Sequence, residues 1–157
     1  MEERTISIEA WYKLAKERAK EGEKIPLCFM VNGISMTPLI RTGMDAVTIL
    51  PKEGPVKKGD IVLFRAKTRT SDYVLHRVYR VNGDLALTLG DGNLAADGWV
   101  RTEDILGVAA ALERNGRWID LESLPLRLWG RLWMRLLPVR RSLLTLGGRQ
   151  WEGKEKR

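Results

Sequence analysis

Apolar residues near the amino terminus recur at helical spacing. The apolar positions within residues 7–22 are Ile8, Trp11, Leu14, Ala15 and Ala19. This repeat of three and four residues is typical of an amphipathic helix. Ser7 can cap the first turn through its hydroxyl, and Gly22 is a residue type at which helices end. The pattern therefore predicts a helix over residues 7–22.

From residue 25 the hydrophobic pattern changes to that of short strands separated by turn residues. The predicted strands are 27–32, 46–50, 60–66, 73–81, 85–89, 105–113 and 117–120. Asn82-Gly83 and Asn115-Gly116 are dipeptides typical of two-residue hairpin turns. Closely spaced short strands favour a mainly β fold, a small bent sheet or partly open barrel over residues 25–122.

A third pattern begins near residue 123. Arg127, Arg131 and Arg135 recur every four residues, while Leu and Trp side chains cover the rest of the helical surface. Pro138 should end this basic amphipathic helix, predicted over 124–137. We therefore expect three parts: a helical segment 1–24, a β-domain 25–122, and a basic helix with its tail, 123–157.

The net charge of +7 lies in the last part of the chain, because residues 127–157 contain nine Lys or Arg and two Glu. This helix can lie in a membrane interface, pack on the β-domain with its arginines in water, or bind nucleic acid. Arginine beside Trp and Leu favours a membrane surface, contacted through residues 124–141, and makes nucleic acid the least favoured partner. The chain has no run of eighteen apolar residues and no signal-like start, so we expect peripheral membrane association, with a cytoplasmic protein as the alternative.

The chain has one cysteine, Cys28, which excludes an internal disulfide. Its neighbours in the 27–31 run are apolar, so we expect Cys28 to be a small buried hydrophobic residue rather than a reactive thiol.

Two residues could form a nucleophile and its base. Ser35 lies in the turn Gly33-Ile34-Ser35-Met36-Thr37-Pro38, directly after a predicted strand. A hydroxyl there can project from backbone N–H groups able to stabilise an oxyanion. Serine needs a base to accept its proton, and His76, on the 73–81 strand, is the single histidine. Taken separately, each residue is more often structural, an ordinary turn or an inert histidine.

Two carboxylates follow in the segment 90–97. Asp97 could orient His76 by accepting from its second ring nitrogen, and Asp91 could brace the turn through backbone N–H groups. An ordinary Asp-Gly-Asn loop is the alternative reading of this segment.

These motifs resemble those of a known superfamily. Residues 33–38 resemble the Gly-x-Ser-Met-x-Pro box of signal peptidase I and the LexA-type self-cleaving repressors. Leu75-His76-Arg77-Val78 resembles the His-Arg box of the endoplasmic-reticulum and archaeal signal peptidases, in which histidine replaces the catalytic lysine. Further similar elements lie at 43–47 (with one inserted residue), 56–62 and 90–97, so that the resemblance covers about residues 26–110.

The resemblance implies a serine endopeptidase with a LexA/signal-peptidase type of β-domain, cleaving a leader or signal-like peptide without metal or cofactor. Ser35 would be the nucleophile, His76 the base, Asp97 the orienting acid and Asp91 a supporting acid. Ser35 N–H would stabilise the oxyanion. The residues implied to contact an extended substrate are Gly33, Met36 and Pro38.

The chain also departs from the pattern of the families it resembles. The sequence shows neither the transmembrane anchor of signal peptidases nor the lysine base and DNA-binding domain of LexA-type proteins. Lys57 and Lys58 lie in the 56–62 element, which is not the motif that carries the base. By analogy, a maturation peptidase for a small leader-bearing peptide fits best. The alternatives are an inactive or self-processing peptide-binding module, and a basic peripheral-membrane or nucleic-acid-binding protein without catalysis.

Overall fold

A computed structural model of the chain describes residues 6–66, 68 and 71–146. Its main element is an eight-stranded open sheet in which all pairings are antiparallel, in the order β1-β2-β7-β3-β4-β5-β6, with β8 also paired to β7. The strands are β1 (Leu27–Met30), β2 (Asp45–Pro51), β3 (Ile61–Arg65), β4 (Tyr73–Asn82), β5 (Leu85–Leu89), β6 (Gly98–Arg101), β7 (Ile105–Arg114) and β8 (Arg117–Asp120). The expected mainly β fold is confirmed.

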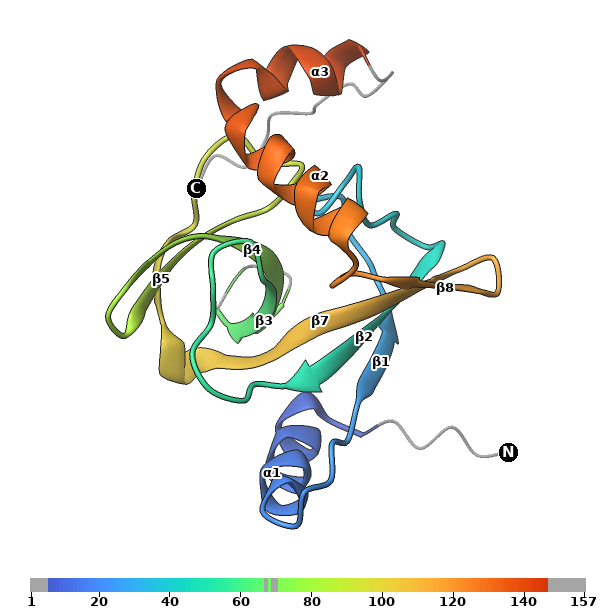
Figure 1. Ribbon diagram of the computed structural model, residues 1–157, viewed down its shortest axis with the longest axis vertical. Coiled ribbons are helices and arrows are strands. Elements are labelled where there is room, and N and C mark those ends of the chain that lie inside the picture. The colour runs from blue at the N-terminus through green and yellow to red at the C-terminus, as the bar shows by residue number, and fades with distance from the viewer. Residues whose placement is uncertain (1–5, 67, 69–70, 147–157) are drawn as a thin grey trace.

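The sheet is strongly coiled, and helices lie at its two ends (Figure 1). Helix α1 (Ile8–Ala19) lies at one end, and α2 (Leu124–Arg135) and α3 (Arg140–Leu146) lie at the other. A one-turn 3-10 helix, η2 (Leu137–Val139), joins α2 to α3, and another, η1 (Thr102–Asp104), precedes β7. The ends of the coiled sheet are thus covered by different parts of the chain.

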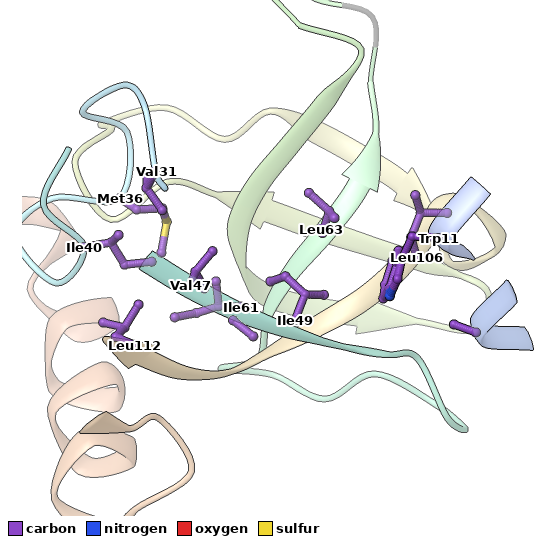
Figure 2. Packing of buried hydrophobic residues seen from close by; sticks show 12 residues of the cluster. Trp11, Val31, Met36, Ile40, Val47, Ile49, Ile61, Leu63, Leu106 and Leu112 are labelled. Carbon is purple, nitrogen blue, oxygen red and sulfur yellow. The ribbon is translucent and has the colours of Figure 1, made fainter. Parts of the chain in front are cut away.

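The main hydrophobic core lies inside the coil and holds the elements together (Figure 2). Its buried strand residues are Val47, Ile49, Ile61, Leu63, Leu106, Ala109 and Leu112. Trp11 enters this core from α1 and donates its indole N–H to the Ile25 carbonyl at 3.0 Å. Met36 and Ile40 enter it from the loop between β1 and β2. That loop contains Ser35, so the core anchors the candidate nucleophile.

The predicted elements agree with the structure to within a few residues at each end, with two exceptions. Ser7 caps α1 as expected, accepting from the Ala10 N–H at 3.1 Å. Strand β6 was not predicted, because it is a four-residue edge strand that begins at a glycine. The α3 helix was not predicted either, since the residues after Pro138 resemble a basic tail.

One predicted hairpin turn is correct and the other is displaced by one residue. Asn115 and Gly116 form the β7–β8 turn with φ values of 52° and 72°, the left-handed conformations that a type I′ turn requires. In the β4–β5 hairpin, Asn82 pairs with Leu85. The two-residue loop is therefore Gly83-Asp84, and the assignment of Asn82-Gly83 was wrong.

The prediction that Cys28 is buried was wrong. Cys28 is exposed on β1, and its sulfur lies 3.2 Å from the Thr48 hydroxyl. The strand is at the sheet edge, paired only with β2, and its side chains alternate between partly buried and exposed. An apolar run does not reveal which of two alternating faces meets the core.

The carboxyl-terminal helix packs on the β-domain with its arginines exposed, and the membrane contact considered for the same helix stays a prediction. Gly130, Trp133 and Met134 of α2 are buried, while Arg127, Arg131 and Arg135 are exposed. Within the described ranges, no helix combines the length and apolar character needed to cross a bilayer. The tail 147–157, with Trp151, lies outside the described residues.

Candidate active site

The turn that carries Ser35 is held from both sides, while the N–H and hydroxyl of Ser35 have no partner among the described residues. Met36 is 2% exposed in the core. The Thr37 N–H and hydroxyl both donate to the Ile34 carbonyl, at 3.1 and 2.8 Å. Gly33 has a φ of 92°, and its N–H donates to the Thr42 hydroxyl at 3.1 Å. Neither the N–H nor the hydroxyl of Ser35 has a hydrogen-bond partner among the described residues, so both are free to act on a substrate.

His76 and Asp97 are in contact. His76 lies on β4 and is 6% exposed, and its Nδ1 lies 2.6 Å from Oδ2 of Asp97. The same carboxylate oxygen accepts from the Thr88 hydroxyl at 2.8 Å, and the Asp97 N–H donates to the Thr88 carbonyl at 2.9 Å. A carboxylate can only accept, so Nδ1 carries the imidazole proton. Nε2 of His76 is then the acceptor nitrogen that a general base needs.

Gly90 lies where His76 and the Ser35 turn meet. A methyl group added at Gly90 would be 3.0 Å from Nε2 of His76 and 2.4 Å from the Ser35 carbonyl oxygen. Nε2 of His76 and the Ser35 carbonyl oxygen therefore both lie close to Gly90. The Ser35 hydroxyl makes no hydrogen bond to His76.

Asp91 contacts a different group from the one predicted. Its buried carboxylate accepts from Nε and Nη2 of Arg77, each at 2.8 Å, and so forms a bidentate pair rather than bonds to turn N–H groups. Arg77 also donates to the Gly59 carbonyl at 3.0 Å. The turn is held instead by the Gly92 N–H, which donates to the Ser35 carbonyl at 2.8 Å. Asp91 thus fixes its loop to β4 from behind the site.

Of the residues implied to contact substrate, Gly33 and Pro38 are exposed and Met36 is not. The Met36 side chain lies in the hydrophobic core, so its implied contact with substrate is wrong. Three large apolar side chains in β1 and in the loop that follows it were not singled out from the sequence. They are Met30, Ile34 and Met44, each about half exposed. Exposed apolar side chains beside an unpaired edge suit the binding of an extended chain.

An apolar cavity of about 400 Å³ lies between the Ser35 loop and the carboxyl-terminal helices. Its lining residues are Thr37, Pro38, Trp129, Leu132, Trp133, Leu136, Leu143 and Leu144. Two buried residues of these helices reach the loop next to Ser35: Trp133 donates to the Asp91 carbonyl at 2.9 Å, and Arg140 donates to the Asn93 carbonyl at 3.1 Å. Sequence analysis missed both, because it treated the helices as separate from the site.

Within residues 6–66, 68 and 71–146, no group of three or more His, Cys, Asp or Glu side chains is arranged to hold a metal ion. The chain matches no protein-family model, and no curated protein is detectably similar to it.

Proposed function

We propose that this chain is a serine endopeptidase of the signal-peptidase and LexA-like type, with Ser35 as nucleophile, His76 as general base and Asp97 as the acid that orients it. One observation carries the proposal. Asp97 holds Nδ1 of His76 at 2.6 Å, while Nε2 of the same ring faces the Gly90 backbone that touches the Ser35 turn. The orienting carboxylate, the imidazole and the partly exposed serine are the three groups that acyl transfer requires.

The reaction follows from these groups. The Ser35 hydroxyl oxygen attacks the scissile carbonyl carbon while its proton moves to Nε2 of His76. The unpaired Ser35 N–H donates to the oxyanion that forms. The carbon–nitrogen bond then breaks as His76 passes the proton to the leaving amine. Water, deprotonated by the same imidazole, next hydrolyses the ester on Ser35 and regenerates the serine.

The substrate is an extended peptide with leader or signal-like sequence. The outer edge of β1 is unpaired and leads directly into the Ser35 turn, so a peptide can add there as a further strand. Met30, Ile34 and Met44 offer apolar contacts along this path. The resemblance to signal peptidases adds a preference for small residues before the scissile bond.

Cleavage of a peptide library, followed by mass spectrometry, tests the proposal. The wild type is compared with Ser35→Ala, His76→Ala and the control Ser142→Ala, an exposed serine of α3. We expect the first two variants to lose activity by at least about three orders of magnitude and the control to retain it. Equal cleavage by all four proteins would refute the mechanism. Binding of peptides without cleavage would instead support the peptide-binding alternative.

We also infer a peripheral association with anionic membranes through residues 124–141. The exposed arginines Arg127, Arg131, Arg135 and Arg141 form no ion pair with any described residue. The neighbouring row on α2 exposes Leu124, Leu128 and Leu132 by 69%, 52% and 56%. Unpaired arginines beside exposed leucines match a surface of anionic head groups over acyl chains.

Co-sedimentation with phosphatidylserine vesicles tests this association. Leu124→Gln/Leu128→Gln should weaken binding by about tenfold per leucine, and added salt should weaken it further. Trp118→Gln is the control, because Trp118 is also exposed but belongs to β8. Equal binding by both variants, or binding to duplex DNA and not to vesicles, would contradict the inference.

A further inference from the structure

The loop of residues 90–93 determines how the Ser35 turn and His76 are spaced. Its Gly92 N–H donates to the Ser35 carbonyl at 2.8 Å. A side chain at Gly90 has no room, because its Cβ would lie 2.4 Å from the Ser35 carbonyl oxygen and 3.0 Å from Nε2 of His76. A displacement of this loop would therefore change the distance between the proposed nucleophile and base.

The opposite side of the 90–93 loop is held by the carboxyl-terminal helices. Trp133 of α2 donates its indole N–H to the Asp91 carbonyl at 2.9 Å. Arg140 of α3 donates Nη1 to the Asn93 carbonyl at 3.1 Å and to the Gly90 carbonyl at 3.4 Å. Three of the four carbonyls in the loop thus accept from two helical side chains that are distant in sequence.

Arg140 is an unusual residue to bury for packing alone. Its side chain is fully buried and forms no ion pair with a described residue, and its Nε has no partner. Nη2 donates to the Trp133 carbonyl at 3.0 Å and to the Tyr79 hydroxyl. Burial raises the pKa of Tyr79, so this acceptor is neutral. Burying a cation without a counter-ion is costly, whereas an apolar side chain could pack α3 without that cost.

We propose that Arg140, with Trp133, is a positioning residue of the peptidase site, which holds the 90–93 loop so that Ser35 and His76 keep their catalytic spacing. Residues 124–146 are then part of the catalytic unit as well as a membrane-facing helical segment. The catalytic consequence rests on the proposed function. The hydrogen bonds from Trp133 and Arg140 to the 90–93 loop, called the clamp below, can be tested independently of the proposed function.

Two variants test the clamp against a matched control. Arg140→Met removes the donors while keeping an unbranched apolar stem, and Trp133→Phe removes one donor while keeping an aromatic ring. Arg141→Met is the control, because Arg141 is the exposed neighbour on the same helix and its side chain has no partner among the described residues. Trp133→Phe keeps the test decisive if Arg140→Met does not fold.

Amide hydrogen exchange and imidazole NMR are the first readouts. Exchange of the Gly92 and Asn93 amides should become about tenfold faster in both variants, because each loses hydrogen bonds to the loop, while the Val47 amide in β2 keeps its rate. His76 is the single histidine, so its ring ¹⁵N signals report the site alone and should shift. A merely structural role would speed exchange at Val47 as much as at Gly92. That result, or unchanged exchange at Gly92 in a folded variant, would overturn the clamp.

Cleavage kinetics then test the catalytic consequence. For a peptide that the wild type cuts, kcat should fall by about tenfold to a hundredfold in Arg140→Met, with KM little changed and Arg141→Met unaffected. A normal kcat together with a loosened loop would overturn the positioning role. If the wild type cuts no peptide, the proposed function fails, and the exchange and NMR results still decide whether the clamp exists.

Discussion

Gly90→Ala is the most direct perturbation of the candidate site. The φ of Gly90 lies outside the left-handed region, so alanine can adopt the same backbone conformation. Its methyl group, however, would lie 2.4 Å from the Ser35 carbonyl oxygen and 3.0 Å from Nε2 of His76. The Ser35 turn is anchored in the core by Met36 and Ile40. The methyl group must therefore separate the serine turn from the histidine.

The magnitude follows from these distances. Restoring an ordinary contact moves the 90–93 loop and the Ser35 turn apart by about 1 Å, and a misplacement of that size costs about 10²-fold in rate. Overpacking of this kind costs about 1–3 kcal/mol of stability. We therefore expect kcat to fall about a hundredfold in a protein that still folds.

The assay compares kcat, KM and the melting temperature of Gly90→Ala with those of Gly54→Ala. Gly54 has a φ of 69° and open space around it, so alanine there costs about 1 kcal/mol through backbone strain alone. We expect a stability loss in both variants and a loss of kcat in Gly90→Ala only. A folded Gly90→Ala protein with wild-type kcat would refute the inference that Ser35 and His76 act across Gly90.

Three further predictions concern the orienting acid, a buried ion pair and the free sheet edge. Asp97→Asn should shift the His76 ring ¹⁵N signals and lower kcat about 10³- to 10⁴-fold; an unchanged kcat would exclude an orienting role. Hydrogen bonds from Arg114 hold the pKa of Asp45 below its usual value, so this stabilisation is complete above about pH 4 and is lost as the pH falls through the lowered pKa. In urea unfolding, Arg114→Met should cost about 3 kcal/mol at neutral pH and progressively less in acid, and a pH-independent loss would contradict this. A bulky maleimide on exposed Cys28 should block peptide cleavage by occupying the β1 edge, and full activity of the labelled protein would argue against docking there.

The contacts of the candidate site were predicted from the sequence only in part. Asp97 reaches His76 as expected, because the chain after β5 turns back beside β5, and β5 in turn pairs with β4, the strand that carries the histidine. Asp91 was assigned the wrong partner. The backbone donors of its own turn are close to it in sequence, whereas its actual partner, Arg77, is brought close only by the fold. Met36 was assigned to the substrate although it lies in the core.

The amino-acid sequence by itself determined the local structure of this protein. Period-2 runs, the Ser7 cap and the Asn115-Gly116 turn depend on neighbouring residues, so all strands except β6, together with α1 and one hairpin, could be predicted from them. The residue types able to carry out acyl transfer were also visible, because Ser35 follows a strand and His76 is the only histidine.

Only the tertiary structure decided what surrounds those residues. Gly130 lies in the middle of α2, where glycine destabilises a helix. The tertiary structure explains this glycine, because a Cβ at this position would be 2.7 Å from the Arg77 guanidinium, which pairs with Asp91 behind the site. Arg140 likewise resembles part of a basic tail in the sequence and is a buried donor to the 90–93 loop in the structure. Burial and hydrogen-bond partners depend on which distant segments pack together, and residue spacing along the chain does not contain that information.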